Sequence, residues 1–118
     1  MKMSRVKLGK LLRRLRKEQG ISLRKLADKV DVSFVNISHI ENGRVSTSKE
    51  TLKQIANALN YDVDNLLAVG DEISDDLESI IRQKPDAVPA FLRSAKNLTS
   101  EEWKKLTEQV EKMQKEKE

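Results

Sequence analysis

The sequence predicts an all-α protein, and three observations support that prediction. Serine, threonine and aspartate precede several apolar runs, at positions where their side chains can cap a helix N-terminus. No stretch of the first 70 residues alternates in the pattern of a strand. The apolar residues instead recur at the spacing of one helix face. The first such stripe consists of Leu8, Leu11, Leu12 and Leu15.

Turn signals divide the first part of the chain into short helices. The first helix is expected to end at Gly20, because glycine readily takes the left-handed conformation of a helix C-terminus. Ser22 is placed to cap a second helix and Ser33 a third, each between two apolar residues that can pack across the cap. Gly43 is expected to end the third helix.

A fourth and a fifth helix complete this part. The run 47–50 (Thr-Ser-Lys-Glu) fits a capping box in which Thr47 caps the fourth helix and Glu50 bonds back to it. A short fifth helix is expected around residues 63–67. Gly70 then marks a boundary, so the chain is expected to contain a five-helix domain over residues 1–70 and a tail over 71–118.

The tail, too, is expected to be helical. Pro89 fits the first turn of a helix, and Thr99 and Glu102 form a complete capping box before the last one. Residues 114–118 are too polar to pack and are expected to fray.

Composition excludes several classes of function. With no cysteine and one histidine, the chain is expected to hold no metal site. It has neither a phosphate-binding glycine loop nor a nucleophile elbow, so no catalytic residue, cofactor or enzymatic activity is expected. No apolar run approaches the roughly 20 residues that span a bilayer, and no signal peptide is evident. A cytoplasmic protein with no membrane association is expected.

Charge is distributed unevenly along the chain. Residues 1–70 carry a net charge of +7, whereas residues 71–118 carry −3. A basic surface favours a nucleic-acid partner, although charged solvent-exposed helix faces are common in proteins of every class.

The second and third helices carry the most specific signal. Two short helices over 22–30 and 33–42, joined by a brief turn, are typical of a helix-turn-helix whose second helix enters a major groove. The residues themselves are Leu26-Ala27-x-x-Val30-x-Val32-Ser33, Ile37-Ser38-x-Ile40-Glu41-Asn42-Gly43, Leu52-x-x-Ile55-Ala56-x-Ala58-Leu59 and Asp64-x-Leu66-Leu67. With these motifs, residues 6–69 resemble the Cro/CI-type (XRE) helix-turn-helix family.

This resemblance implies a five-helix, lambda-repressor-like domain that binds double-stranded DNA and usually acts as a symmetric dimer. The tail is similar in length and helical character to that of short-tailed repressors of the SinR kind. In the family, a first-helix arginine often pairs with the glutamate that ends the recognition helix. Arg16 and Glu41 hold those positions, so a partly buried ion pair that orients the helix is expected.

The resemblance also implies which residues contact DNA. The residues expected at base edges or elsewhere on the exposed face of the third helix are Phe34, Val35, Asn36, Ser38 and His39. Those expected at phosphates are Ser33, Asn42 and Arg44. The family often has a glutamine at the position of Leu23, and Arg24 or Lys25 is expected to replace its phosphate contact electrostatically. Apolar side chains suit thymine methyl groups. Two alternatives stay open: Phe34 could belong to the core, and His39 could merely fill the groove.

An apolar stripe in the tail has three interpretations. It could fold back on the tail's own helices, pair with a second chain, or bind a protein that controls DNA binding. Because a short tail offers little core of its own, a two-fold interface is favoured. The residues assigned to it are Leu77, Ile81, Phe91, Leu92, Trp103, Leu106, Val110 and Met113.

Two functions therefore compete. The favoured one is a transcriptional regulator, a homodimeric repressor that recognises an inverted repeat through the helix starting at Ser33. The alternative is an antitoxin or anti-regulator whose tail binds a protein partner while its N-terminal domain regulates its own gene.

Overall fold

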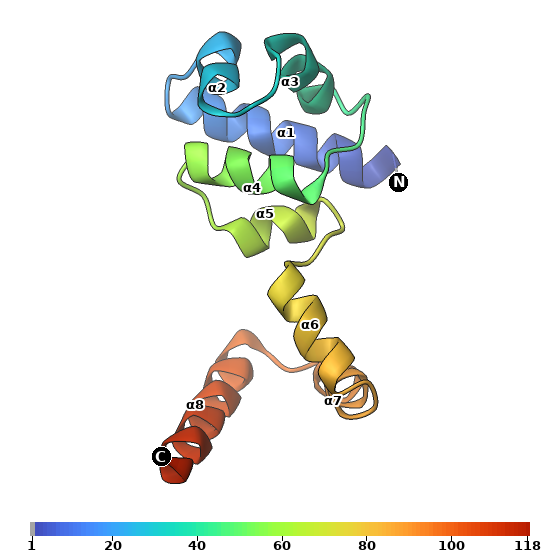
Figure 1. The fold of residues 1–118 in the computed structure, drawn as a ribbon, viewed down its shortest axis with the longest axis vertical. Coiled ribbons are helices and arrows are strands. Elements are labelled where there is room, and N and C mark those ends of the chain that lie inside the picture. The colour runs from blue at the N-terminus through green and yellow to red at the C-terminus, as the bar shows by residue number, and fades with distance from the viewer. Residues whose placement is uncertain (1) are drawn as a thin grey trace. The chain divides into compact units, whose positions relative to one another are not determined.

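The computed structural model describes residues 2–118, with side chains from residue 4 onward. These residues form eight helices and no strand, so the prediction of an all-α protein is confirmed (Figure 1). The helices are α1 (Lys2–Glu18), α2 (Leu23–Lys29), α3 (Phe34–Glu41), α4 (Lys49–Ala58), α5 (Val63–Val69), α6 (Asp75–Gln83), α7 (Ala87–Ala95) and α8 (Ser100–Lys117). They pack into two units, residues 1–78 and 79–118. Among residues 2–118, no helix combines the length and apolar character that crossing a membrane requires.

Local signals set the ends of the first helices as predicted. Ser22 accepts a hydrogen bond from the backbone N–H of Lys25 and caps α2, and Ser33 caps α3 in the same way. Gly20 and Gly43 follow α1 and α3 with φ of +67° and +70°, in the left-handed region where glycine carries no Cβ penalty. These caps fix where the second and third helices begin and stop.

The start of α4 corrects the sequence prediction by one residue. Ser48, not Thr47, is the cap, and its Oγ accepts from the backbone N–H of Thr51 at 3.2 Å. Ser48 also donates a hydrogen bond to the hydroxyl of Thr51 at 3.0 Å. The sequence alone does not show this second bond, because Thr47 and Ser48 are both suitable cap residues. Within the described residues, Thr47 Oγ1 is buried with no hydrogen-bond partner.

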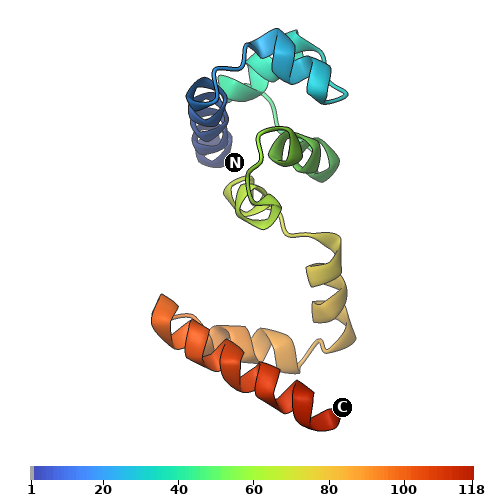
Figure 2. The ribbon, with the colours of Figure 1, turned by 90° about the vertical axis from the view of Figure 1, so that its left-hand side faces the viewer.

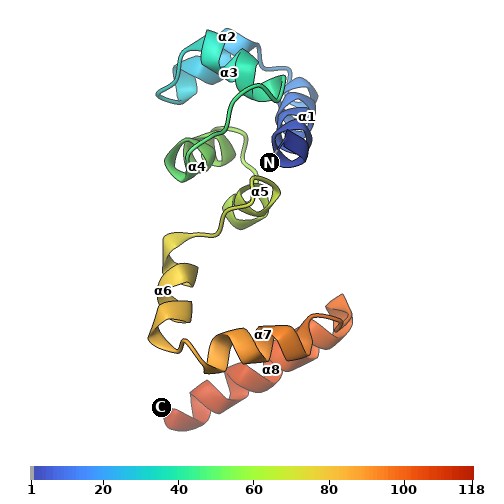
Figure 3. The ribbon, with the colours of Figure 1, turned by 90° about the vertical axis from the view of Figure 1, so that its right-hand side faces the viewer.

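The core of the first unit lies between α1, α2, α3, α4 and α5. In Figures 2 and 3, α1 and α4 lie on opposite sides of this interior, with α2 and α3 closing one end and α5 the other. Every one of these helices contributes apolar side chains that are almost fully buried. The largest are Leu12, Leu26, Ile37, Ile40, Leu52, Ile55, Leu59, Leu66 and Leu67. Burial of this apolar surface is the main force that holds α2 and α3 in place.

The first residues of α6 belong to this unit. Lys49 on α4 forms ion pairs with Asp75, at 3.2 Å, and with Glu78. The hydrogen bond to Glu78 is the main cause that raises the pKa of Lys49. Ser74 is buried and donates to Asp76. These contacts place residues 71–78 with the first unit rather than with the tail.

The second unit contains the end of α6 with α7 and α8, and little of it is buried. Phe91 and Trp103 meet edge to face with ring centroids 6.1 Å apart, and Ala95 is buried. The predicted capping box of Thr99 and Glu102 is confirmed. The expected fraying of residues 114–118 is wrong, because α8 continues to Lys117. Its last turn carries lysines, which suit the negative end of a helix dipole.

Candidate nucleic-acid interface

The helices α2 and α3 are separated by four residues, 30–33, and pack against each other across apolar side chains. Leu26 of α2 and Ile37 of α3 lie in the common core. The turn between them is also held from α4, because the Oε1 of Gln54 accepts from the backbone N–H of Asp31 at 3.0 Å. This arrangement is a helix-turn-helix whose second helix has a solvent-exposed face.

The exposed face begins at the N-terminus of α3. Phe34 is 39% exposed and Val35 51% exposed, while Ile37 and Ile40 are buried on the opposite side. Phe34 therefore lies outside the buried core, and the first interpretation left open by the sequence is not supported. Asn36 is exposed beside them, and its backbone N–H bonds to the Ser33 cap. Two exposed apolar side chains, Phe34 and Val35, therefore lie at the N-terminal end of α3.

Arg24 on α2 lies directly over Phe34. Its guanidinium carbon is 4.4 Å from the centre of the phenyl ring, which is cation–π geometry. Both residues line a shallow hollow of about 280 Å³, together with Ala27, Asp28, Val32 and Ser33. The contact holds a positive charge next to the apolar tip of α3.

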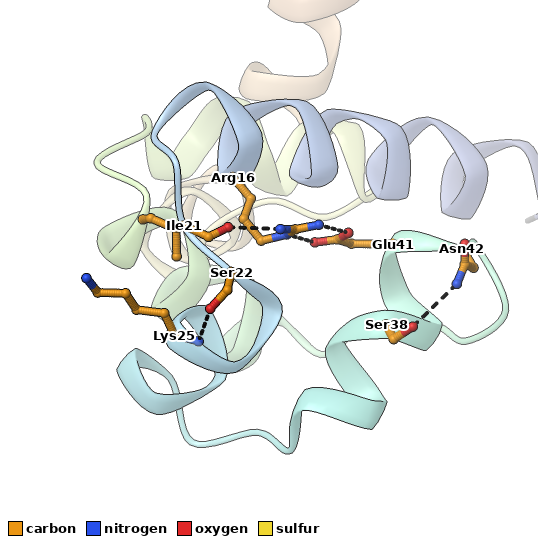
Figure 4. A network of polar contacts seen from close by, with 7 residues as sticks. All are labelled: Arg16, Ile21, Ser22, Lys25, Ser38, Glu41 and Asn42. Atoms are coloured by element: carbon orange, nitrogen blue, oxygen red, sulfur yellow. Dashed lines mark hydrogen bonds and ion pairs between the residues drawn. The ribbon is translucent and has the colours of Figure 1, made fainter.

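The residues expected farther along α3 and after it lie in two environments. Ser38 and His39 are half-buried, and Asn42 and Arg44 are exposed in the loop that follows the helix. Asn42 Nδ2 donates to Ser38 Oγ at 3.5 Å (Figure 4). The backbone N–H of Arg44 donates to the carbonyl of His39 at 3.0 Å, which closes the loop on the helix.

The structure brings Arg16 and Glu41 together (Figure 4). Arg16 Nε donates to Glu41 Oε2 at 2.7 Å, and its Nη2 donates to Oε1 at 3.0 Å. The side chains are only 10% and 6% exposed. A bidentate pair of this kind fixes direction as well as distance.

Arg16 makes a third hydrogen bond, which links the ion pair to the segment before α2. Arg16 Nη1 donates to the carbonyl oxygen of Ile21 at 2.9 Å, just before the cap of α2 (Figure 4). The hydrogen bond to Glu41 is the main cause that raises the pKa of Arg16. One side chain therefore connects α1, the start of α2 and the end of α3.

Gly9 is a positioning residue that the sequence interpretation missed. A Cβ at this position would lie 2.3 Å from the carbonyl oxygen of Glu41 and 2.7 Å from that of Ile40. Since both oxygens belong to the backbone, rotating a side chain cannot relieve the clash. The signal was present in the sequence, because a glycine inside an otherwise regular helix costs about 1 kcal/mol relative to alanine.

The tail residues assigned to an interface are only partly brought together. Phe91 and Trp103 contact each other within one chain, and Ile81 and Leu106 are half-buried. The residues that remain exposed are Leu77, Phe91, Leu92, Val110 and Met113. Among the described residues, no group of three or more His, Cys, Asp or Glu side chains is placed to hold a metal ion.

Known proteins share this helix-turn-helix. A family model described as helix-turn-helix matches residues 12–66. The HTH-type transcriptional regulator DdrOP3 of Deinococcus deserti is 37% identical over 62 residues, which are 52% of this chain and 48% of that protein. The ImmF control region 10 kDa protein of Bacillus phage phi105 is 38% identical over 60 residues, 51% of this chain and 67% of that protein.

A likeness in fold extends farther along the chain. The solved structure of the SinR protein/SinI protein complex matches 92% of this chain and 98% of its own chain, with a TM-score of 0.50. Its sequence identity of 20% makes this a likeness of fold alone. The chain spans about half the length of the Deinococcus relative, and the sequence similarity to both relatives covers about half of this chain.

Proposed function

Because this chain belongs to the helix-turn-helix family of the Cro/CI (XRE) type, we propose that it is a sequence-specific transcriptional regulator, acting as a dimeric repressor. The family and the lambda-repressor-like fold predicted from the sequence are confirmed. The observation that carries the proposal is the exposed N-terminus of α3, oriented by the buried pair of Arg16 and Glu41.

In the proposed complex, α3 enters the major groove. Phe34 and Val35 pack on thymine methyl groups, while Asn36, Ser38 and His39 offer donors and acceptors to base edges or nearby phosphates. The phosphate contacts come from Ser33, Asn42 and Arg44 at the two ends of α3, with Arg24 adding positive charge. The net charge of +7 on residues 1–70 supports association with a polyanion.

The base and phosphate assignments make different predictions. Replacing His39 with alanine is expected to change which sequences are preferred, because its ring is assigned to base edges. Arg44→Ala is expected to weaken binding to all sequences and to lower the slope of log K against log salt by about one. Titrations of a panel of duplexes at several salt concentrations measure both effects. An equal loss on every duplex from both variants would contradict the placement of His39.

We further infer that the tail forms a two-fold interface. Val110 and Met113 on α8 are 47% and 61% exposed, although they continue the stripe of Trp103 and Leu106. A second copy of the stripe would cover them. Dimerisation makes the second half-site contact intramolecular, which multiplies the two affinities. A two-fold axis then spaces the two copies of α3 by about one DNA turn, roughly 34 Å.

A charge-matched pair of variants tests this interface. The double substitution Val110→Glu with Met113→Glu is expected to give a monomer and to weaken operator binding at least tenfold, because it buries charge in the interface. Lys112→Glu changes the net charge equally and lies away from the stripe, so it is expected to stay dimeric. Sedimentation equilibrium reports the mass. If the double variant stays a dimer, the tail stripe is not the interface.

A monomeric wild-type chain would point to the alternative function. Its exposed tail residues would then be available to another protein, as expected of an antitoxin or anti-regulator. Copurification of a stoichiometric protein partner that is released by the Val110→Glu and Met113→Glu double variant, but retained by Lys112→Glu, would favour that alternative.

A further inference from the structure

We propose that Arg24 and Phe34 together recognise a pyrimidine with a C5 methyl group followed by guanine. In this arrangement, a 5-methylcytosine in a CpG step makes the same contact as thymine in a TpG step, so binding responds to cytosine methylation. The inference rests on the proposed DNA-binding function and names the bases that the tip of α3 selects.

The first step concerns the apolar tip. Phe34 and Val35 are the first two residues of α3 and are 39% and 51% exposed. Neither side chain donates or accepts a hydrogen bond, so neither can distinguish the O4 of thymine from the N4 amine of cytosine. In the major groove, what such side chains can detect is the methyl group at C5. Thymine and 5-methylcytosine both carry it, whereas cytosine and uracil do not.

The second step concerns Arg24. Its guanidinium lies 4.4 Å from the centre of the Phe34 ring and forms no ion pair among the described residues. The contact engages the guanidinium at its central carbon, so N–H donors stay available for hydrogen bonds. A planar donor fork matches the O6 and N7 acceptors of guanine, the most common specific arginine contact in a major groove. Phe34 therefore holds the arginine ready for a base instead of leaving it mobile.

The third step joins the two contacts. Arg24 and Phe34 line the same hollow, so a base that meets the arginine and a base that meets the phenyl ring must be close neighbours in the duplex. In that arrangement, a methyl group next to the guanine packs against the phenyl ring of Phe34, which lies beside the guanidinium. The arrangement thus favours a methylated pyrimidine and a guanine at successive positions.

The test uses the 118-residue chain and a duplex selected from random DNA. Within each half-site, the pyrimidine of a pyrimidine–guanine step is made thymine, uracil, cytosine or 5-methylcytosine in turn. Burial of one methyl group predicts about fourfold weaker binding for uracil than for thymine, and a similar gain from cytosine to 5-methylcytosine. Phe34→Ala is expected to remove both differences. Because Phe34 is exposed, the Phe34→Ala variant is expected to fold normally, and an unchanged Tm checks this.

A second measurement addresses Arg24. Replacing the guanine with 7-deazaguanine removes the N7 acceptor and is expected to weaken wild-type binding about tenfold, since a bidentate contact is lost. Arg24→Ala is expected to abolish that difference. Lys25→Ala, the neighbouring exposed cation on α2, serves as the control and is expected to keep it.

Two results overturn the inference while leaving the regulator proposal intact. One is a selected duplex whose affinity is the same with thymine and uracil at every half-site position. The other is an equal loss on all duplexes from Arg24→Ala with a salt slope lowered by about one, which marks a phosphate contact. A selection that yields no preferred sequence overturns both proposals.

Discussion

Glu41→Ala is expected to lower the free energy of unfolding by about 3 kcal/mol, because it leaves the buried guanidinium of Arg16 without its charged partner. The lost pair also frees the C-terminal end of α3, so DNA affinity is expected to fall further than stability alone explains. Urea unfolding of the 118-residue chain measures the first effect, and titration under conditions where the variant is folded measures the second.

The ion pair of Lys49 provides the control. Its partners Asp75 and Glu78 have exposed side chains, at 76% and 36%, and pairs that solvent screens in this way contribute little to stability. Lys49→Ala is therefore expected to have a small effect on stability and none on DNA affinity. A loss from Glu41→Ala no larger than that from Lys49→Ala would show that the pair with Arg16 does not hold the recognition helix.

Gly9→Ala is expected to destabilise the fold by about 2–3 kcal/mol, although alanine is the better helix former. The added Cβ would lie 2.3 Å from the backbone oxygen of Glu41, so α1 and α3 must separate. Separation also lengthens the bonds between Arg16 and Glu41. Thermal and urea unfolding check the stability, and the same variant is expected to bind operator DNA more weakly.

Gly20 supplies a matched substitution without the clash. It has a φ of +67°, and a Cβ there would meet no atom within 4 Å. Gly20→Ala is thus expected to cost only the roughly 1 kcal/mol of a left-handed alanine. If Gly9→Ala stabilises the chain, as helix propensity alone predicts, then the stability of the fold does not depend on the close approach of α1 to α3.

Much of the fold follows from local signals in the sequence. Caps such as Ser22 and Ser33 and the glycines after α1 and α3 act over three or four residues, so the sequence contains all the information they need. The predicted apolar stripe of the first helix is confirmed, because Leu8, Leu12 and Leu15 are buried and Leu11 packs partly buried against them. The start of α4 was displaced because Thr47 and Ser48 are adjacent residues with equal capping chemistry.

The site was less accessible from the sequence, because its geometry depends on tertiary contacts. The positions of Arg16 and Glu41 came from a family resemblance, since no local spacing rule joins residues 25 apart. The stacking of Arg24 on Phe34 depends on how α2 and α3 pack, and the bond from Gln54 to the turn depends on α4. Gly9 had a local signal, its poor helix propensity. Nothing in the sequence indicated that the backbone of Ile40 and Glu41 on α3 packs against it.

Selection of random duplex DNA by the 118-residue chain tests the central claim most directly. At about 0.15 M salt, where non-specific phosphate binding is weakened, an inverted repeat is expected with half-sites roughly 34 Å apart, one turn of DNA. Such a repeat would establish a symmetric, sequence-specific DNA-binding protein. Recovery of no preferred sequence, with binding that disappears as salt rises, would contradict the proposed regulator.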